Sequence, residues 1–420
     1  MNRGTMISIC VSLLLVFLFY NMHSSKFETT YTSDAIESES YSYVSTKPNF
    51  LFLKTHKTGS STLGSIFFLY GVKRKLNFVL PPYTGTLMDV NEEFVETLLP
   101  PRPGQTWNIQ SQHCRFNRDF QHLVLPKETT FYTSVTRSPI SHFKSTFSFF
   151  GHEERLRKEH GDLNDYDELV NIYLDETCST IDADEIVPVS NGCLELNTIA
   201  RDLGWTWFTE QMEHLSVQQR LDKFIEMLDE ELDFVMITDK MDESLVVLKN
   251  LLGWDMTDIL YLNKKVTERK SNSDITEKTN QRLLKAMELD RQIFMFFSYK
   301  FDFHVKRIGK EEVSAEVQQF ITMRQNFEDL CFDKNEGTKP VCVDCPNENL
   351  GRTVTWELSQ YGKTENLACA FLHTDFRLYP RVVSDLLLSG DYSDSTFKYL
   401  LSTEDRDIKE VIQKMVYSEK

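Results

Sequence analysis

Apolar residues gather three times along this chain into a short strand-like run, followed after a polar turn by a longer helix-like run. Each pair has the length and pattern of a β-strand joined to an α-helix. Strands that alternate with helices predict a parallel sheet with helices on both faces, which is an α/β fold. The three predicted units cover residues 49–72, 130–150 and 234–252.

The other segments fit around this sheet. Residues 107–110 predict a further short strand that leads to His113, and residues 151–230 are charged and predicted to be mostly helical. Residues 309–330 also predict a helix, within a C-terminal extension, residues 306–420, that we expect to be mainly helical. The sequence leaves open whether this extension belongs to the main domain or forms a small separate module.

An uncharged apolar segment, residues 6–20, stands near the N-terminus after Arg3. We interpret it as a transmembrane signal anchor, and its short length suits the thin membranes of the early secretory pathway. A cleaved signal peptide is the alternative. Basic charge before the span predicts that residues 1–5 are cytosolic and that the rest is lumenal. Residues 21–47 are polar without hydrophobic periodicity, which predicts a flexible stem.

Composition limits the class of protein. The 420 residues include 41% hydrophobic side chains and 30 phenylalanines, enough for a large globular core. The formal net charge of −17 argues against a general nucleic-acid binder, because such a protein needs a basic surface. We therefore expect no nucleic-acid partner.

The eight cysteines give a mixed signal. Cys10 lies in the predicted anchor, so an odd number remains in an oxidising lumen, and at least one has no intramolecular partner. Cys342 and Cys345 form a C-x-x-C pair, with Cys331 and Cys369 nearby. We expect disulfides. A zinc site and buried thiols stay open as alternatives, although the irregular spacing and the missing pair of histidine ligands disfavour zinc.

The turn of the first unit gives the most specific chemical signal. Such a turn collects backbone N–H groups and the positive end of a helix dipole at one point. Residues 51–80 contain no Asp or Glu, although the whole chain is acidic. The pattern therefore predicts a site for a phosphate-like anion. The candidate site residues of the turn are Lys54, His56, Lys57, Thr58, Gly59, Ser60, Ser61 and Thr62.

This turn is not a Walker A loop, in which the lysine follows the second glycine. Here Lys57 precedes Gly59, the only glycine of the turn. An ordinary strand-to-helix turn with solvated lysines is the alternative, with its Ser and Thr residues acting as helix caps. Capping and anion binding are compatible, since both use the same donors.

The order Lys-Thr-His-Lys-Thr-Gly-Ser-Ser-Thr, from Lys54 to Thr62, resembles the 5′-phosphosulfate loop of Golgi carbohydrate sulfotransferases. Its His-Lys pair narrows the resemblance to the galactose 3-O-sulfotransferase family. Three further segments resemble this family in the same order, residues 111–117, 131–150 and 233–254. The resemblance covers residues 48–305 and implies a P-loop-like sulfotransferase fold for them.

The resemblance implies that 3′-phosphoadenosine 5′-phosphosulfate (PAPS) is the donor and that no metal is required. Lys57 is then the cation at the phosphosulfate, with Lys54 as a weaker candidate, and residues 58–62 surround the 5′-phosphate. Arg137 and Ser145 are expected to bind the 3′-phosphate, since a guanidinium group suits phosphate geometry. Both anion motifs fall at the carboxyl edge of the predicted sheet, where ligands of such sheets bind.

The implied acceptor is the 3-hydroxyl of galactose in a glycolipid, such as galactosylceramide, or in a glycan. Histidine can take the acceptor proton near neutral pH. We expect His56 to be this base because it stands beside Lys57. His113 is the second candidate, as base or as a group that orients the acceptor. The resemblance also implies a Golgi membrane protein with a lumenal catalytic domain; a homodimer stays open.

Two weaker features complete the set. Trp205 and Trp207 are candidates for stacking on a sugar ring, although aromatic residues at this spacing are more often core. A basic cluster follows the third unit, and the resemblance implies that such a loop closes over the nucleotide. The alternative is an ordinary solvated basic run. Its residues are Lys264, Lys265, Arg269 and Lys270.

Three other functions remain as alternatives. A lumenal sulfotransferase for a glycosaminoglycan has the same donor site. A nucleotide kinase is disfavoured because the P-loop lysine is missing. A non-catalytic lumenal binding protein is expected to have lost donor-binding residues, whereas all those we expect are present.

Overall fold

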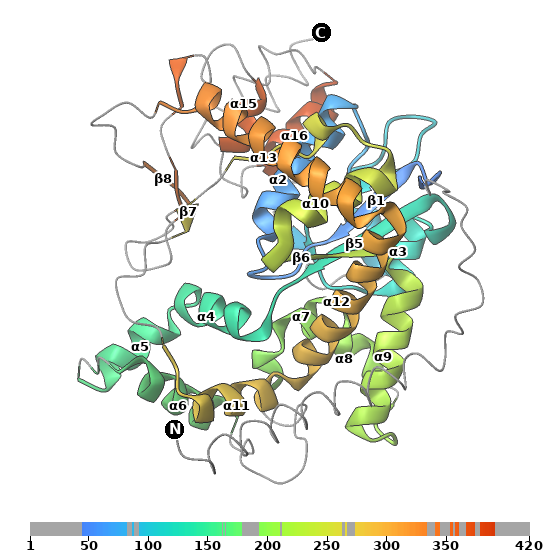
Figure 1. The fold of residues 1–420 in the computed structure, drawn as a ribbon. Coiled ribbons are helices and arrows are strands. Elements are labelled where there is room, and N and C mark those ends of the chain that lie inside the picture. The colour runs from blue at the N-terminus through green and yellow to red at the C-terminus, as the bar shows by residue number, and fades with distance from the viewer. Residues whose placement is uncertain are drawn as a thin grey trace. The chain divides into compact units, whose positions relative to one another are not determined.

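A four-stranded parallel sheet forms the centre of the protein in the computed structural model (Figure 1). The strand order is β3-β1-β5-β6, and every neighbouring pair is parallel. The predicted α/β fold is thereby confirmed. The strands of this sheet are β1 (Asn49–Leu53), β3 (Ile109–Gln110), β5 (Thr130–Thr136) and β6 (Phe234–Ile237).

The structure describes much of the chain from residue 44 onward, including the last four residues of the predicted stem. Its described residues are 44–81, 86–87, 92–161, 163, 165–178, 193–210, 212–262, 265–266, 274–333, 341–344, 353–355, 358–360, 367–373 and 379–390. The predicted anchor, residues 6–20, lies outside them. Within the described residues, no helix combines the length and apolar character that crossing a bilayer requires.

All three predicted strand-helix units are confirmed, because β1, β5 and β6 are each followed by a helix. Only the last two residues of the predicted strand 107–110 form β3, which pairs with β1. The helices predicted within residues 151–230 are present wherever the structure describes that range, and the helix predicted at 309–330 is α13.

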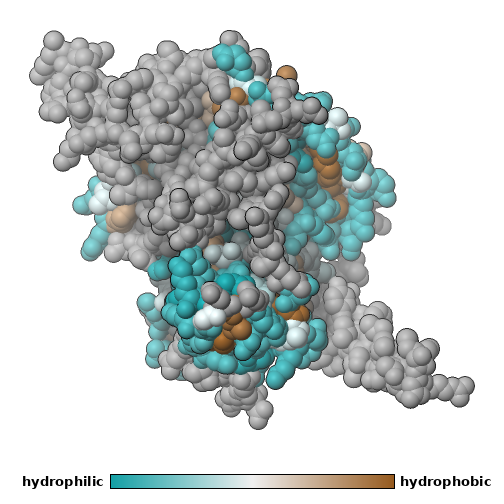
Figure 2. Space-filling view, turned by 90° about the vertical axis from the view of Figure 1, so that its left-hand side faces the viewer, coloured by the Kyte–Doolittle hydropathy of each residue, from teal (hydrophilic) through white to brown (hydrophobic). Residues whose placement is uncertain are grey.

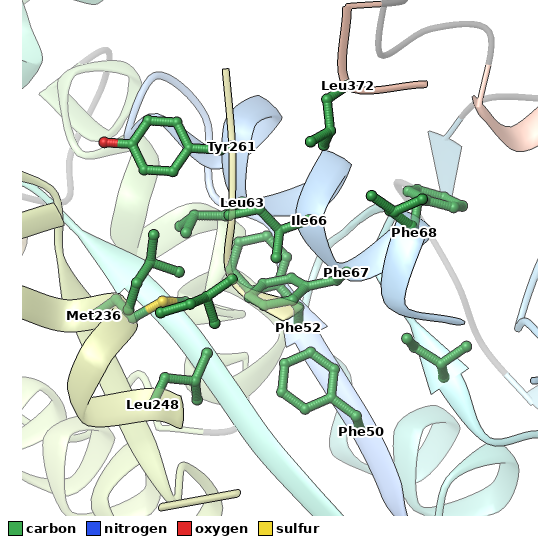
Figure 3. Close-up of a cluster of buried hydrophobic side chains, with 14 of the residues drawn as sticks. Phe50, Phe52, Leu63, Ile66, Phe67, Phe68, Met236, Leu248, Tyr261 and Leu372 are labelled. Atoms are coloured by element: carbon green, nitrogen blue, oxygen red, sulfur yellow. The ribbon is translucent and has the colours of Figure 1, made fainter. Parts of the chain in front are cut away.

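Alternate residues of β1 point to opposite faces of the sheet, and both faces are covered. Phe50 and Phe52 join one hydrophobic cluster, whereas Leu51 and Leu53 join another. A strand buried on both faces explains the continuous apolar run in the sequence. Figure 3 shows the first cluster, in which Phe50 and Phe52 meet Phe67 of the helix after β1.

The helices over this first face are joined to the sheet by that cluster. Figure 1 shows them together on one side of the sheet, which agrees with their shared core. They are α2 (Ser60–Lys73), α10 (Met241–Leu252), α13 (Lys310–Cys331), α15 (Leu367–His373) and α16 (Tyr379–Ser389).

The second face is covered by helices from the middle of the chain. The long helix α12 crosses the sheet, since Leu289 and Ile293 join the second cluster and Phe301 joins the first. The helices over this face are α3 (Arg118–Val124), α7 (Thr198–Asp202), α8 (Trp205–Thr209), α9 (Val217–Glu231) and α12 (Glu288–Ile308).

A third hydrophobic cluster lies beyond the carboxyl ends of the strands, where the helix after β5 meets three others. Phe143 and Phe147 stack there and contact Tyr173. A disulfide joins Cys178 to Cys193 at this cluster. Its helices are α4 (Pro139–Phe149), α5 (His152–Glu159), α6 (Tyr166–Thr177) and α11 (Glu277–Ala286).

The C-terminal segments share the first cluster rather than a core of their own. Tyr379 of α16 stacks on Phe371 of α15 and also contacts Phe68 of α2. A disulfide joins Cys331 to Cys369, so these two sulfurs are not zinc ligands. Cys345 and the side chain of Cys342 lie outside the described residues.

Short strands and single turns complete the described chain. One parallel pair joins β2 (Thr86–Leu87) to β4 (His113–Cys114), and an antiparallel set joins β7 (Lys265–Val266), β9 (Thr353–Thr355) and β8 (Val341–Asp344). The 3₁₀-helices are η1 (Glu92–Thr97), η2 (Lys127–Thr129), η3 (Cys193–Leu196), η4 (Thr238–Lys240) and η5 (Met256–Asp258). Figure 2 shows a face on which hydrophilic residues predominate among those coloured.

Candidate active site

The turn between β1 and α2 is held from its inner side. Thr58 is buried, and its hydroxyl donates to the carbonyl oxygen of Thr55 over 3.1 Å. The carbonyl oxygen of Thr58 accepts from the hydroxyl of Thr238, 2.7 Å away. Gly59 has a φ of 71°, and a Cβ there would lie 2.8 Å from Cε of Met241. The backbone conformation therefore favours glycine, whereas the end of the Met241 side chain can move to make room.

This arrangement leaves backbone donors facing outward. The N–H groups of residues 58–61 have no acceptor among the described residues. The first turn of α2 contains no acidic residue, and the positive end of the helix dipole points here. The hydroxyl of Ser60 is used inside the turn, where it donates to the carbonyl oxygen of Thr55. Ser61 is exposed and Thr62 half-buried. Together these groups can bind an anion.

Arg137 lies against the same turn. It follows β5 directly, and its Nη1 donates to the carbonyl oxygen of Lys57 over 3.0 Å. Its Nε donates to the hydroxyl of Ser141 in the first turns of α4, 2.9 Å away. The predicted neighbourhood of the two anion motifs is therefore present. Ser145 lies further along α4 and is half-buried.

Lys57 connects the turn to the end of α4. Its backbone has a φ of 56°, which is uncommon for a residue other than glycine. Its ammonium group lies 3.4 Å from the centre of the Phe149 ring. A cation over an aromatic face is attracted by the ring's electron density. The side chain is thus held at the side of the turn that faces α4.

His56 is oriented by a buried carboxylate. Asp202, at the end of α7, is 3% exposed and lies 2.8 Å from Nδ1 of His56. The same carboxylate accepts from the backbone N–H of His56 over 2.6 Å. A carboxylate only accepts, so Nδ1 carries the proton and Nε2 keeps its lone pair in the neutral ring. Nε2 has no partner among the described residues, and the side chain is 23% exposed.

His113 is bound differently. Its ring stacks on that of His56 with centroids 4.2 Å apart, and its Nδ1 lies 3.0 Å from the carbonyl oxygen of Lys54. Because a carbonyl only accepts, Nδ1 is the donor, and Nε2 accepts from the Lys54 ammonium over 2.5 Å. Burial, and then the Lys54 ammonium, hold the pKa of His113 well below its ordinary value. His113 is therefore neutral, and its lone pair is already in use.

Lys54 is the inner cation of the site. It is 2% exposed and contacts Ser61, whose hydroxyl lies 3.5 Å from Nζ, as well as His113. The buried ammonium group thus lies between the second histidine and the start of α2. Its charge adds to the positive potential at the turn from the buried side.

Comparison with known proteins identifies the family. A sequence model described as galactose-3-O-sulfotransferase matches residues 4–343. The chain belongs to the galactose-3-O-sulfotransferase family. The resemblance found in the motifs is thereby confirmed.

Individual relatives of this family member are distant. Human galactosylceramide sulfotransferase is 29% identical over 68% of this chain and 64% of its own length. Mouse galactose-3-O-sulfotransferase 2 is 24% identical over 71% of this chain and 73% of its own. Human galactose-3-O-sulfotransferase 3 is 26% identical over 69% and 64%. The chain spans just under two thirds of the length of the human galactosylceramide sulfotransferase.

In this galactose-3-O-sulfotransferase family member, the predicted site residues meet at one edge of the sheet. The turn carries Lys54, His56 and Lys57; His113 stacks on it, and Arg137 is bonded to it. Their chemical roles stay predictions. Ser145 is brought onto α4 near the turn, with no contact that defines a role.

Sequence reasoning missed Asp202. It lies 146 residues after His56, in a short helix without a recognisable motif. The nearest signal is Gly204, whose φ of 93° suits glycine. An added Cβ there would overlap the carbonyl oxygen of Phe116, so the end of α7 packs closely on the chain after His113. Neither observation can be made without the tertiary structure.

The hypothesis that Trp205 stacks on a sugar ring is wrong, and the hypothesis about the basic cluster is not tested. Trp205 is 1% exposed and meets Phe224 edge to face, so it is a core residue and not a sugar platform. Trp207 is half-buried against Phe116. Most of the basic cluster at 264–270 lies outside the described residues; of Lys265 only the backbone, in β7, is described.

Proposed function

We propose that the protein transfers the sulfuryl group of PAPS to the 3-hydroxyl of galactose, in a glycolipid such as galactosylceramide or in a glycan. The family description supports galactose as the acceptor. So do the relatives, which are named galactosylceramide sulfotransferase and galactose-3-O-sulfotransferase. The choice between lipid-linked and glycan-linked galactose is left to the experiment below.

The turn before α2 supports PAPS as the donor substrate. Its unused N–H groups and the helix dipole favour a phosphate group. Arg137 adds a second cationic point, whose planar fork of donors suits phosphate. PAPS has phosphate at both its 3′ and 5′ positions. It can therefore offer one anion to each point at the same sheet edge.

The protein's own groups account for the transfer step. Nε2 of His56 takes the proton from the galactose 3-hydroxyl as its oxygen attacks sulfur. Asp202 keeps the ring in the required tautomer and stabilises the imidazolium that results. A new sulfur–oxygen bond forms to galactose, and the bond from sulfur to the phosphate oxygen breaks. Lys57 and the N–H groups neutralise the charge that develops on that phosphate oxygen.

One observation carries the proposal. A base with an unpartnered nitrogen, His56, precedes Lys57 in the chain, and the carbonyl oxygen of Lys57 accepts from Arg137 over 3.0 Å. The base and the phosphosulfate cation thus lie in one turn, and the proposed phosphate-binding arginine is hydrogen-bonded to it. Sulfuryl transfer needs these three groups together, because donor binding, charge neutralisation and proton removal occur at one centre.

We further propose that the protein is a single-pass type II protein of the Golgi membrane, anchored by residues 6–20, with its catalytic domain in the lumen. The disulfides Cys178–Cys193 and Cys331–Cys369 support this, because disulfides persist in oxidising compartments. A tag at the C-terminus should resist protease in intact Golgi vesicles and be digested once detergent is added. Digestion without detergent would contradict the proposed topology.

An acceptor screen tests the activity. The full chain is incubated with PAPS that carries radioactive sulfate, and with galactosylceramide, lactosylceramide, N-acetyllactosamine and heparan fragments. We expect label on at least one galactose acceptor, and none on a matched acceptor whose galactose O3 is methylated. Label on heparan alone would favour the glycosaminoglycan alternative. Binding of the product nucleotide without any transfer would favour the non-catalytic alternative.

A further inference from the structure

The short helix α7 is held at both ends by carboxylates. Asp202, at its C-terminal end, binds the side chain and backbone N–H of His56. At the other end, Asp290 of α12 accepts from the backbone N–H groups of Ile199 and Ala200, at 3.2 and 2.8 Å. Asp290 is completely buried. The helix therefore links a buried carboxyl group to the proposed base.

A side-chain amide strengthens this attachment. Oδ1 of Asn197, the residue before α7, accepts from the backbone N–H of Asp290 over 3.1 Å. Its Nδ2 donates to the carbonyl oxygens of Cys193 and Ala286, at 2.9 and 2.7 Å. The start of α7 is thus bonded to the start of α12 in both directions. Such a network fixes one arrangement, because a broken bond would leave buried polar groups without partners.

His142, on α4, connects the main chain of His56 to the same helix. Its Nε2 donates to the carbonyl oxygen of His56 over 2.9 Å and lies 3.3 Å from the hydroxyl oxygen of Thr198, in α7. Its Nδ1 lies 3.8 Å from a carboxyl oxygen of Asp290, too far for a hydrogen bond, and has no hydrogen bond among the described residues. Both the side chain and the main chain of His56 are therefore connected to α7, the helix that Asp290 binds.

The charges around Asp290 are few. Arg201 and Asp202 come from α7 and His142 from α4; on its own helix, Glu288 and Arg291 bind each other at 2.6 Å. Arg201 is paired with Glu195 over 2.6 Å. Burial raises the pKa of Asp290 to about 7.

From this convergence we infer that Asp290 is a positioning residue for the proposed reaction, which fixes the orientation of His56 through α7 and His142 without touching either substrate. This inference rests on the proposed role of His56 as the base. The two carboxyl groups then act in series, because Asp202 holds the ring and Asp290 holds the helix that carries Asp202.

Two substitutions at Asp290 and a matched control test the inference. Asp290→Ala removes the acceptor for both N–H groups, whereas Asp290→Asn keeps the shape and one acceptor. Asp233→Ala is the control, because Asp233 also accepts a backbone N–H, from Tyr132 over 2.8 Å, but at the opposite edge of the sheet. If Asp290→Ala does not fold, Asp290→Ser is used in its place. Its side chain is polar but shorter than that of aspartate.

We expect Asp290→Ala to lower kcat by about 10²-fold with the KM for PAPS little changed, since a small displacement of a reacting group has an effect of this size. Asp290→Asn should restore most of the rate. With ¹⁵N-labelled histidine in the full chain, the spectrum of His56, assigned with a His56→Gln variant, should lose its Nδ1–H tautomer signature in Asp290→Ala and keep it in Asp233→Ala.

An unchanged His56 signature in Asp290→Ala, or in Asp290→Ser, would overturn the inference. So would an equal change in Asp233→Ala, because the effect would then be one of general stability. Failure of the proposed function is recognised separately: the wild-type protein would transfer no sulfate, while the histidine spectra would still report whether Asp290 orients His56.

Discussion

Charged groups lie at both edges of the central sheet. At one edge they are paired with one another, whereas at the other several donors and one lone pair have no partner in the described part of the chain. At the amino edge, Asp233 accepts from Lys47 and Lys127 over 2.8 Å each and from the backbone N–H of Tyr132 over 2.8 Å. All three of these partners are groups of the protein itself. At the carboxyl edge, the N–H groups of residues 58–61 and Nε2 of His56 have no partner among the described residues.

The difference separates a structural site from a candidate functional one. Charges that satisfy each other, as around Asp233, stabilise the fold and leave little affinity for a ligand. At the carboxyl edge, a rigid turn fixes N–H donors and a lone pair that have no partner among the described residues. These groups are available to bind a substrate, and ligands of parallel sheets bind at this edge. The following predictions test that contrast.

The largest expected effect comes from the proposed base. His56→Ala should lower kcat by about 10²- to 10⁴-fold, the range for loss of general acid–base catalysis. Binding of the product nucleotide 3′-phosphoadenosine 5′-phosphate (PAP) should persist, because the turn and Arg137 remain. Transfer assays and calorimetry with PAP measure the two effects. A kcat reduced by no more than about threefold, a much smaller loss than this range, would show that His56 is not the base.

Loss of the carboxylate behind the base should have an effect of similar size. Asp202→Asn keeps the size of the side chain but disturbs the tautomer of His56, and the matching change in a Ser-His-Asp triad lowers kcat by about 10⁴-fold. The KM for PAPS should change little. The split between kcat and KM is the measurement, and a rise in KM alone would contradict the orienting role.

At the amino edge the opposite outcome is expected. Asp233→Ala leaves Lys47, Lys127 and the N–H of Tyr132 without their shared acceptor, at a stability cost of about 1–3 kcal/mol. The kcat of the folded protein should match wild type. Urea unfolding measures the stability, and transfer assays on the same sample measure kcat. A loss of kcat without a loss of stability would contradict the proposed difference between the two edges.

The last prediction concerns the pH dependence of stability. Burial lowers the pKa of His142 from 6.5 to about 4. Between these values His142 binds a proton in the unfolded chain but not in the folded protein. The contribution of His142 to stability therefore falls as pH falls from 6.5 to 4, by up to about 1.4 kcal/mol per pH unit.

His142→Gln isolates this effect, because its amide can still donate to the carbonyl of His56. Asp290, whose pKa burial raises to about 7, contributes the opposite slope in both proteins, so it offsets His142 in wild type and acts alone in the variant. The free energy of unfolding of wild type minus that of the variant should therefore rise as pH rises from 4 to 6.5, as urea titrations can show. Parallel curves would mean that folding does not lower the pKa of His142.

The parts of the fold that the sequence predicts are those set by local patterns. The run Phe50–Leu53 is apolar at every position because β1 is buried on both faces, and Gly59 marks the start of α2 through its positive φ. The anion turn is predictable for the same reason, because it stands at the end of a recognisable strand. Arg137 and the two histidines are singled out instead by the family resemblance of the motifs that contain them.

The rest depends on tertiary contacts that no local pattern encodes. Asp202 reaches the site, and Asp290 reaches α7, only because α7 and α12 pack together in the second cluster. The packing of Tyr379 on Phe68, and the short strands β7 to β9, likewise join segments far apart in the chain. Trp205 resembles a sugar platform in sequence, yet burial against Phe224 makes it core.

Titration with PAP tests the central claim most directly, by following thermal unfolding of wild type, Arg137→Ala and Asp233→Ala. At about a hundred times its Kd, PAP should stabilise wild type and Asp233→Ala by about 2.7 kcal/mol. The same concentration should stabilise Arg137→Ala far less. Equal stabilisation of all three proteins, or of none, would contradict the claim that the carboxyl edge binds the sulfate donor.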